Sequence, residues 1–290
     1  MTGRRHIDTS TLALTMLTLI SFASNSLLTR LALGAGEIDA ATFTSLRLAA
    51  GAVALTLIVW RRPGARLRLL PTEIGGPLVL FAYAVPFSFA YLRIGAATGA
   101  LVLFGVVQLT MIGWGIVRGQ RPAPGEWVGL ALASAGLVAL TLPSAARPDA
   151  LGLSLMAAAG VAWGAYSLAG RTSRDPVTVN ARSFVWSCPP AILVNVLMRG
   201  SLVATSRGVA LAIACGAVTS ALGYVVWYRA LRGLSVTQAA AAQLSVPVIA
   251  AAGAVVLLGE RLNPRLVIAG LAVLSGVALV LAARAEQARP

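Results

Sequence analysis

The sequence contains no lysine, a single histidine and few acidic residues, and each shortage excludes a kind of chemistry. Only 11% of the 290 residues are charged and 58% are hydrophobic, whereas a soluble domain is about a quarter charged. Without lysine, neither a P-loop of the usual kind nor a Schiff base can form. Because His6 lies beside the N-terminus, a Ser–His or Cys–His catalytic pair within the apolar runs is also excluded.

The acidic residues are kept out of the apolar runs. All nine fall in predicted loops, tails or helix ends: Asp8, Glu37, Asp39, Glu73, Glu126, Asp149, Asp175, Glu260 and Glu286. An intramembrane aspartyl protease is therefore excluded, and a proton relay through buried carboxylates is disfavoured. Cys188 and Cys215 lie inside apolar runs and imply no disulfide framework. We expect neither an enzyme nor a cofactor or metal site.

What the sequence has in abundance is apolar runs of the length that crosses a bilayer, about 20 residues. There are ten: 11–33, 40–60, 73–92, 96–118, 125–143, 150–170, 178–198, 207–228, 235–258 and 264–284. The first run exceeds the apolar core of a signal peptide, so we expect a retained helix. No loop is long enough to form a domain of its own. The pattern predicts an all-α, multi-pass membrane protein with ten transmembrane helices.

The arginines predict the orientation. All 23 basic residues are Arg, of which fourteen lie on the N-terminal side of the predicted membrane, six lie on the opposite side and three lie within apolar runs. By the positive-inside rule, both termini are expected in the cytoplasm, with the chain in a bacterial inner membrane. The arginines are spread over loops rather than gathered in one patch. The net charge of +14 therefore suits anionic lipid headgroups at the cytoplasmic face and not nucleic acid.

The chain also repeats itself weakly at a period of about 140 residues. Asp39 and its following Thr recur as Asp175 and its following Thr, and the tripeptide Gly119-Gln120-Arg121 parallels Gly259-Glu260-Arg261. We expect two five-helix repeats, residues 1–143 and 144–290. Since five is odd, the second repeat must be inverted relative to the first. Inverted repeats are typical of secondary transporters, although a duplicated channel or scaffold would show the same pattern.

These features resemble a known family. The five-plus-five repeat, the Gly259-Glu260-Arg261 ending of the ninth span and the glycines of the last helix, Gly270 and Gly276, resemble the drug/metabolite transporter superfamily, EamA type. In the length of the chain and the aromatic content of its expected cavity, the protein most resembles the YddG-type aromatic amino-acid exporters. The resemblance implies export of small metabolites. Gln120 departs from the matching Glu260, so a role shared by that position is in doubt.

Polar and aromatic groups at the middle of a span mark a candidate pathway, because such groups are costly against lipid. The candidate substrate-binding residues are Phe22, Asn25, Tyr83, Gln108, Trp163, Tyr166, Trp186 and Gln243. The candidate gating residues, which interrupt or kink helices, are Pro86, Pro189, Pro190 and Pro247. Phe22 and Trp163 occupy matching positions of the two repeats. Gln108 and Gln243 are interpreted equally well as ligands of a zwitterion or as interhelical hydrogen-bonding groups.

Two further features have competing interpretations. Gly160 and Gly164 have GxxxG spacing, for which we favour helix packing over lining of a site. Arg47 and Arg182 lie one to two turns inside their helices; snorkelling to the headgroups is favoured over binding of a carboxylate.

The sequence thus predicts export of neutral, above all aromatic, amino acids by alternating access. The absence of buried acids favours facilitated diffusion or exchange over obligate proton coupling. Export of drugs or nucleobases would use the same aromatic surface, and a non-transporting scaffold is the alternative of a different class.

Overall fold

The computed structural model describes residues 7–62, 67, 73–94, 96–141, 149–198, 203–259 and 264–286. This described part is a helical bundle without β-strands, apart from one isolated bridge between Ile38 and Ala204. Its helices are α1 (Thr9–Leu33), α2 (Ala40–Trp60), α3 (Gly75–Tyr91), α4 (Ala96–Val117), α5 (Pro124–Thr141), α6 (Ala150–Gly170), α7 (Pro176–Leu197), α8 (Ser206–Ala214), α9 (Gly223–Ala230), α10 (Val236–Gln243), α11 (Ser245–Leu258) and α12 (Pro264–Glu286). A π-helix, η4 (Cys215–Leu222), joins α8 to α9.

The ten predicted spans coincide with these helices to within about two residues at each end. Eight spans in the described residues are long and apolar enough to cross a membrane; α3 is shorter at 17 residues, and α7 contains an arginine and two internal prolines. The eighth span is the continuous run of α8, η4 and α9. The ninth span consists of α10 and α11 and is interrupted at Leu244. The expected all-α membrane fold is confirmed.

Matched acids begin the matched helices of the two repeats. Asp8, Asp39, Asp149 and Asp175 are the N-caps of α1, α2, α6 and α7. Each carboxylate accepts a hydrogen bond from the backbone N–H three residues later, at 2.7–3.3 Å. A cap of this kind satisfies an otherwise unpaired donor at the helix start. The aspartate that recurs in the sequence, Asp39 and Asp175, therefore begins the same helix in each repeat.

Matched glycines end matched helices. Gly119, just past α4, and Gly259, just past α11, have φ values of +81° and +68°. This left-handed conformation is the one in which glycine commonly ends a helix, because a Cβ there is strained. The glycine of the repeated tripeptide is thus explained by backbone geometry. Glu260 and Arg261, which follow the second glycine, lie outside the described residues.

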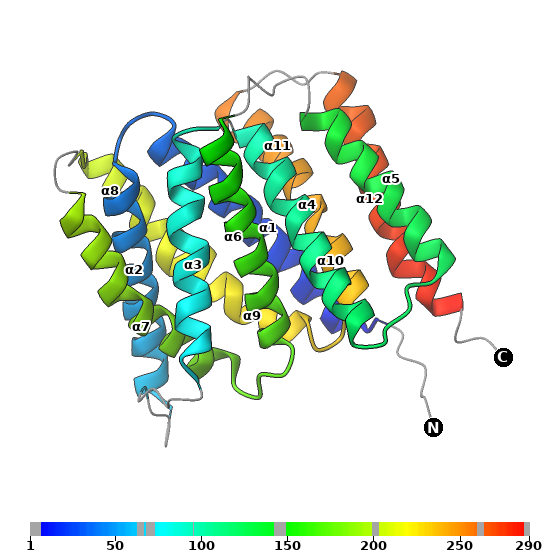
Figure 1. The fold of residues 1–290 in the computed structure, drawn as a ribbon, viewed down its shortest axis with the longest axis horizontal. Helices are drawn as coiled ribbons and strands as arrows, with labels where there is room; N and C mark the ends of the chain where they lie inside the picture. Colours follow the sequence, from blue (N-terminus) through cyan, green and yellow to red (C-terminus); the bar gives the residue numbers. More distant parts are fainter. Residues whose placement is uncertain are drawn as a thin grey trace.

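The packing of the helices shows the inverted two-fold relation directly. Helix α3 packs on α6, and the corresponding contact in the other half is that of η4 and α9 with α1. In the same way, α4 packs on α6, and the corresponding α11 packs on α1. The pairs α2–α7 and α5–α12 join equivalent helices and lie at opposite edges of the bundle (Figure 1). The first turn of α1 and the last turn of α12 lie at the same end (Figure 1).

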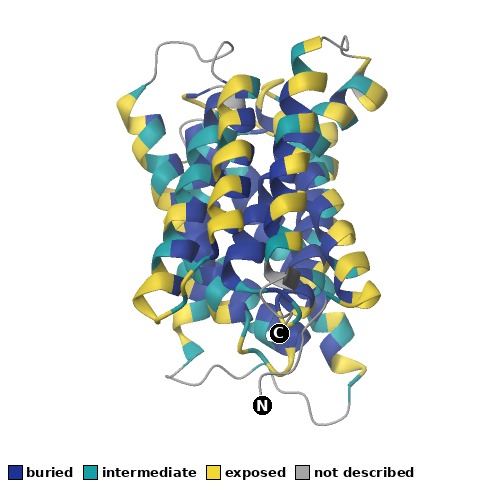
Figure 2. Ribbon diagram, turned by 90° about the vertical axis from the view of Figure 1, so that its right-hand side faces the viewer, coloured by how far each residue is buried: buried dark blue, intermediate teal, exposed yellow. Residues whose placement is uncertain are grey.

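Exposed residues lie on the outside of the bundle, and buried residues lie at its centre (Figure 2). Large hydrophobic side chains such as Leu109, Val117, Val256 and Ile268 are at least 70% exposed. A soluble monomer rarely leaves so much apolar surface open, whereas lipid tails cover it at no cost.

Small residues hold α5 and α12 in close contact. An added Cβ at Gly276 would meet the backbone N of Ala133 and the backbone O of Gly129 at 2.5 Å. On the other side, an added Cβ at Gly136 would meet the backbone N of Val273 at 2.8 Å. Backbone atoms cannot give way as flexible side chains can, so glycine is required for this approach.

Replacing Gly276 should therefore destabilise the protein. Gly276→Ala is expected to cost about 1–3 kcal/mol through overpacking and to lower the melting temperature of the detergent-purified protein. The matched control is Gly113→Ala in α4, where nothing lies within 4 Å of an added Cβ and the helix propensity improves. Equal melting temperatures for the two variants would contradict this packing.

Candidate functional site

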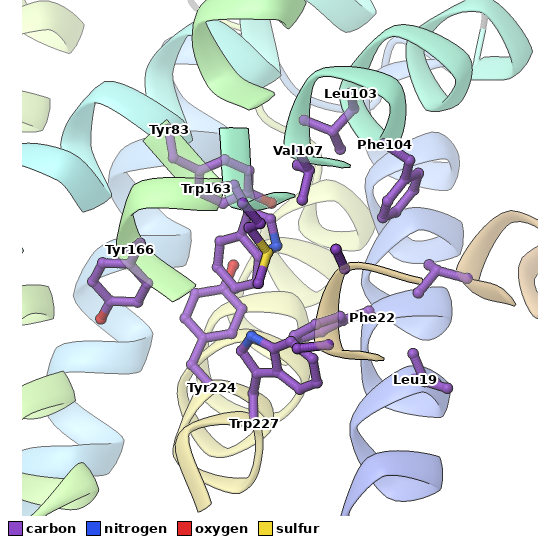
Figure 3. Packing of buried hydrophobic residues seen from close by; sticks show 14 of the residues in the cluster. Leu19, Phe22, Tyr83, Leu103, Phe104, Val107, Trp163, Tyr166, Tyr224 and Trp227 are labelled. Atoms are coloured by element: carbon purple, nitrogen blue, oxygen red, sulfur yellow. The ribbon is translucent and has the colours of Figure 1, made fainter. Parts of the chain in front are cut away.

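An aromatic cluster lies between the two repeats at the middle of the bundle (Figure 3). Its central member is Trp163 of α6, whose ring centroid lies 5.2 Å from Phe22, 5.0 Å from Tyr83 and 4.7 Å from Tyr224. These rings come from α1, α3, α6 and α9. The repeat-related Phe22 and Trp163 thus contact each other, which places the cluster where the two halves meet.

A cavity of about 30 Å³ opens beside these rings. It is lined by Phe22, Asn25, Ser26, Tyr83, Phe87, Leu103, Phe104, Trp163 and Tyr224. None of these side chains carries a formal charge. The volume holds about two or three water molecules, so the site is closed and would admit a metabolite only after the surrounding helices separate.

Trp163 is tied to the interrupted ninth span. Its Nε1–H donates to Gln243 Oε1 at 2.6 Å, and the Gln243 amide nitrogen faces Met111 Sδ and the backbone oxygen of Ala239. Gln243 is the last residue of α10, and α11 begins two residues later. Pro247 has no N–H to donate to the Gln243 carbonyl, which accounts for the interruption at this point.

Arg47 of α2 is the buried cation of the site. Its side chain is 1% exposed, so the expectation that it snorkels to the headgroups is wrong. Its Nε donates to Ser220 Oγ at 2.9 Å, and its Nη2 donates to Tyr224 Oη at 2.7 Å and to Tyr83 Oη at 3.4 Å. The guanidinium carbon lies 5.4 Å and 5.6 Å from the ring centroids of Tyr83 and Phe87. Five hydrogen-bonding and aromatic contacts outweigh an approach to the lipid surface.

The π-helix η4 supplies the polar side of the site. Ser220 Oγ accepts from Asn25 Nδ2 at 2.7 Å as well as from Arg47, and Asn25 Nδ2 also donates to Thr219 Oγ1 at 3.2 Å. A π-turn adds a residue to the helical turn and so re-aims side chains; such turns are frequent at functional sites. Here the turn directs two neighbouring hydroxyls toward α1 and α2.

Tyr166 and Gln108 lie next to the cluster but do not line the cavity. The Tyr166 hydroxyl donates to Asn180 Oδ1 at 2.8 Å, and its ring packs on Trp163 at 5.9 Å. Gln108 accepts from Ser134 Oγ at 3.3 Å on the α5 side of α4, and its buried Nε2 has no hydrogen-bond partner.

Trp186 lies apart from the cluster. It is 45% exposed on the outer side of α7, and its Nε1 donates at 3.4 Å to the backbone oxygen of Leu67. Pro189 and Pro190 follow it without breaking the helix, because α7 continues to Leu197. Pro86 likewise sits within an uninterrupted α3.

The GxxxG pair of α6 packs against α4. An added Cβ would meet the side chain of Val106 at 2.8 Å from Gly160, and that of Thr110 at 2.9 Å from Gly164. The favoured packing interpretation of this pair is therefore confirmed. The close approach brings Trp163, between the two glycines, to the face shared with α1 and α9.

The sequence did not indicate several residues that belong to the site, chiefly Phe87, Tyr224, Thr219 and Ser220. A signal for Tyr224 does exist, since Tyr224, Trp227 and Tyr228 repeat at i, i+3 and i+4 and so share one helix face. All three are almost completely buried. The two hydroxyls have no such signal, because an unbroken α-helical register does not aim both toward α1 and α2.

A larger vestibule of about 700 Å³ opens at the end of the bundle opposite the termini. Arg93 and Asp149 lie on its wall and form an ion pair at 2.8 Å between α3 and α6. The hydrogen bond from Arg93 lowers the pKa of the Asp149 carboxyl. At the termini end, Arg62 pairs with Asp175, and Arg182 pairs with Glu73. Polar contacts thus join the helices at both ends of the closed site.

Comparison with known proteins gives the family. The model of the EamA-like transporter family matches residues 150–282. An uncharacterized protein of Pseudomonas aeruginosa is 46% identical over 285 residues, which cover 97% of this chain and 98% of that protein. The chain belongs to the EamA-like transporter family. It is therefore a multi-pass membrane transporter, as the resemblance in the sequence implies.

Two further similarities add to the EamA assignment. A protein of Streptantibioticus cattleyicolor named a probable terminal-alkyne amino-acid exporter is 25% identical over 271 residues, with 91% of each chain covered. One crystal structure superposes with a TM-score of 0.80 at 21% identity and covers 96% of this chain and 98% of its own. At that identity the structural match shows the fold alone.

The hydroxyl of Ser220 is expected to be critical for stability. Ser220→Ala leaves buried donors of Asn25 and Arg47 without an acceptor, which costs about 1–3 kcal/mol or more for the charged partner. The melting temperature of the purified protein should fall measurably. Ser154→Ala is the matched control, because Ser154 is exposed and bonds only to its own helix. A melt of Ser220→Ala that matches the control would refute the network.

Proposed function

We propose that this transporter exports neutral amino acids with apolar, above all aromatic, side chains by alternating access. The observation that carries the proposal is the uncharged aromatic cavity between the inverted halves. Aromatic rings at 4.7–5.2 Å spacing present both faces and edges. Such surfaces accept an apolar or aromatic side chain by burial and edge-to-face contact, with about 0.5–1.5 kcal/mol for each ring pair beyond burial.

The residues we assign to substrate are those that the structure brings together. Phe22, Tyr83 and Trp163 form the aromatic wall, and Asn25 supplies an amide at its edge. Gln243 holds Trp163 in place through the indole hydrogen bond. The exporter name of the Streptantibioticus cattleyicolor relative supports an amino-acid substrate class.

The arginine distribution supports cytoplasmic termini in a bacterial inner membrane, with anionic lipids at the arginine-rich face. With that orientation, the vestibule at the opposite end opens to the outside. A metabolite leaving the cavity would pass Phe87 and then Phe89, which lines the vestibule.

Facilitated diffusion or exchange suits the placement of the acids. In the described residues, the carboxylates cap helices, lie in the first or last turn of a helix or pair with arginines at the bundle ends. None of them lines the cavity, where a proton-carrying carboxylate would have to exchange with substrate.

Uptake of labelled phenylalanine into proteoliposomes tests this function. We expect saturable uptake by the wild type that is at least about tenfold lower in Trp163→Ala, because the central ring of the wall is lost. Trp163→Phe keeps a ring and should retain partial activity. Trp186→Ala, a tryptophan on the outer surface, is the matched control and should transport as the wild type does.

A pH gradient across the same vesicles tests coupling. We expect the initial rate to be indifferent to the gradient, since no carboxylate lines the cavity. A rate that follows the gradient would overturn the uncoupled mechanism while leaving the substrate in place. Uptake of planar drugs or nucleobases without any amino acid would instead transfer the function to that class, and an inert protein would indicate a scaffold.

A further inference from the structure

The second repeat of the chain provides a natural comparison for Arg47. Arg182 lies one residue short of the equivalent position in α7 and has a carboxylate partner, Glu73. Arg47 has only neutral partners, the hydroxyls of Ser220, Tyr224 and Tyr83, and its Nη1 is buried without any hydrogen-bond partner. A guanidinium remains protonated at any physiological pH. One arginine of the pair is therefore neutralised and the other is not.

An uncompensated cation in a membrane interior is expensive, and such groups mark functional sites. No acid in the described part of the chain pairs with Arg47. Neutral hydroxyls satisfy part of its hydrogen-bonding capacity but supply no negative charge. The structure thus holds a fixed positive charge and an N–H donor without a partner, for which the described part of the chain provides no anion.

The guanidinium lies directly behind the cavity wall. Tyr83, Phe87 and Tyr224 both line the cavity and contact Arg47. The hydrogen bond to Tyr83, at 3.4 Å, is the longest that Arg47 makes. It is the one that an entering anion displaces most readily, since it is long and a carboxylate can accept two parallel bonds from a guanidinium.

We propose that Arg47 is the anchor for the carboxylate of the transported substrate. The substrate class is then an organic acid with an apolar or aromatic tail: the carboxylate bonds to the guanidinium and the tail packs on Trp163 and Phe22. Because no carboxylate lines the cavity, an ammonium group on the substrate is not required. This inference rests on the proposed function, which it narrows to a chemical group and a residue.

Ligand binding to the purified protein tests the anchor without transport. The probes differ only in their polar end: phenylalanine, 3-phenylpropionate, phenylalaninamide and 2-phenylethylamine. Affinity is measured by quenching of tryptophan fluorescence, since Trp163 and Trp227 adjoin the cavity cluster. We expect both acids to bind about 10- to 100-fold more tightly than the amide and the amine. Equal affinity of the acids and the amide would overturn the anchor, with no variant needed.

Variants locate the preference at one residue. Arg47→Gln should abolish the discrimination between acid and amide, whereas Arg47→Lys, which keeps the charge, should retain the preference at lower affinity. Arg182→Gln, which removes the arginine near the equivalent place in the other repeat, should leave the ratio of the two affinities unchanged. Retention of the ratio in Arg47→Gln would refute the assignment. If Arg47→Gln does not fold, Arg47→Lys and the wild-type probe series decide the matter.

The outcomes separate the anchor from the proposed function. Binding of 3-phenylpropionate with the Arg47 dependence, but without transport of any amino acid, would keep the anchor and remove the amino-acid exporter. Transport of phenylalanine together with equal binding of the acids and the amide would keep the exporter and remove the anchor. A protein that binds no acid at all would overturn the anchor as well.

Discussion

The hydrogen-bonding network around Ser220 is the interaction on which the site depends. In a membrane interior there is no water to satisfy polar groups, so a donor placed there is costly unless it finds an acceptor in the protein. A single hydroxyl accepts from Asn25 and from Arg47 and so joins α1, α2 and the eighth span. The π-turn that presents this hydroxyl breaks the regular helix at the one place where three elements need the same acceptor. The aromatic wall is then fixed through Tyr224, one turn further along, which accepts from the same arginine.

The two repeats share a scaffold but differ at the site. Their helices start at matched aspartates, end at matched glycines and pack in exchanged pairs. Phe22 faces Trp163 across the interface, with different rings on the two sides. Arg47 is enclosed by hydroxyls and rings, while its counterpart is paired with an acid. Symmetry supplies the common framework, and the ligand chemistry that we propose lies in the differences between the halves.

Apolar run length and repeat matches are local or periodic properties, and the sequence predicted the ten spans and the matching mid-span positions of Phe22 and Trp163 from them. Properties set by three-dimensional neighbours escaped prediction. The burial of Arg47 depends on hydroxyls more than 170 residues away in the chain, and the direction of Ser220 depends on a π-turn that no residue type specifies. Trp186 shows the converse error: its mid-span position is clear from the sequence, but the face it occupies is decided by the packing of α7.

The interruption at Leu244 divides the ninth span between two sets of neighbours. Its first part, α10, packs mainly on α4 and α12, whereas its second part, α11, packs mainly on α1. A continuous helix would transmit any tilt at one end rigidly to the other end. With the interruption at Leu244, a tilt of one part need not be imposed on the other, and the residue before the interruption bonds to the central indole. A tilt of α10 would therefore act on Gln243 and on the Trp163 ring bonded to it, without the same tilt in α11.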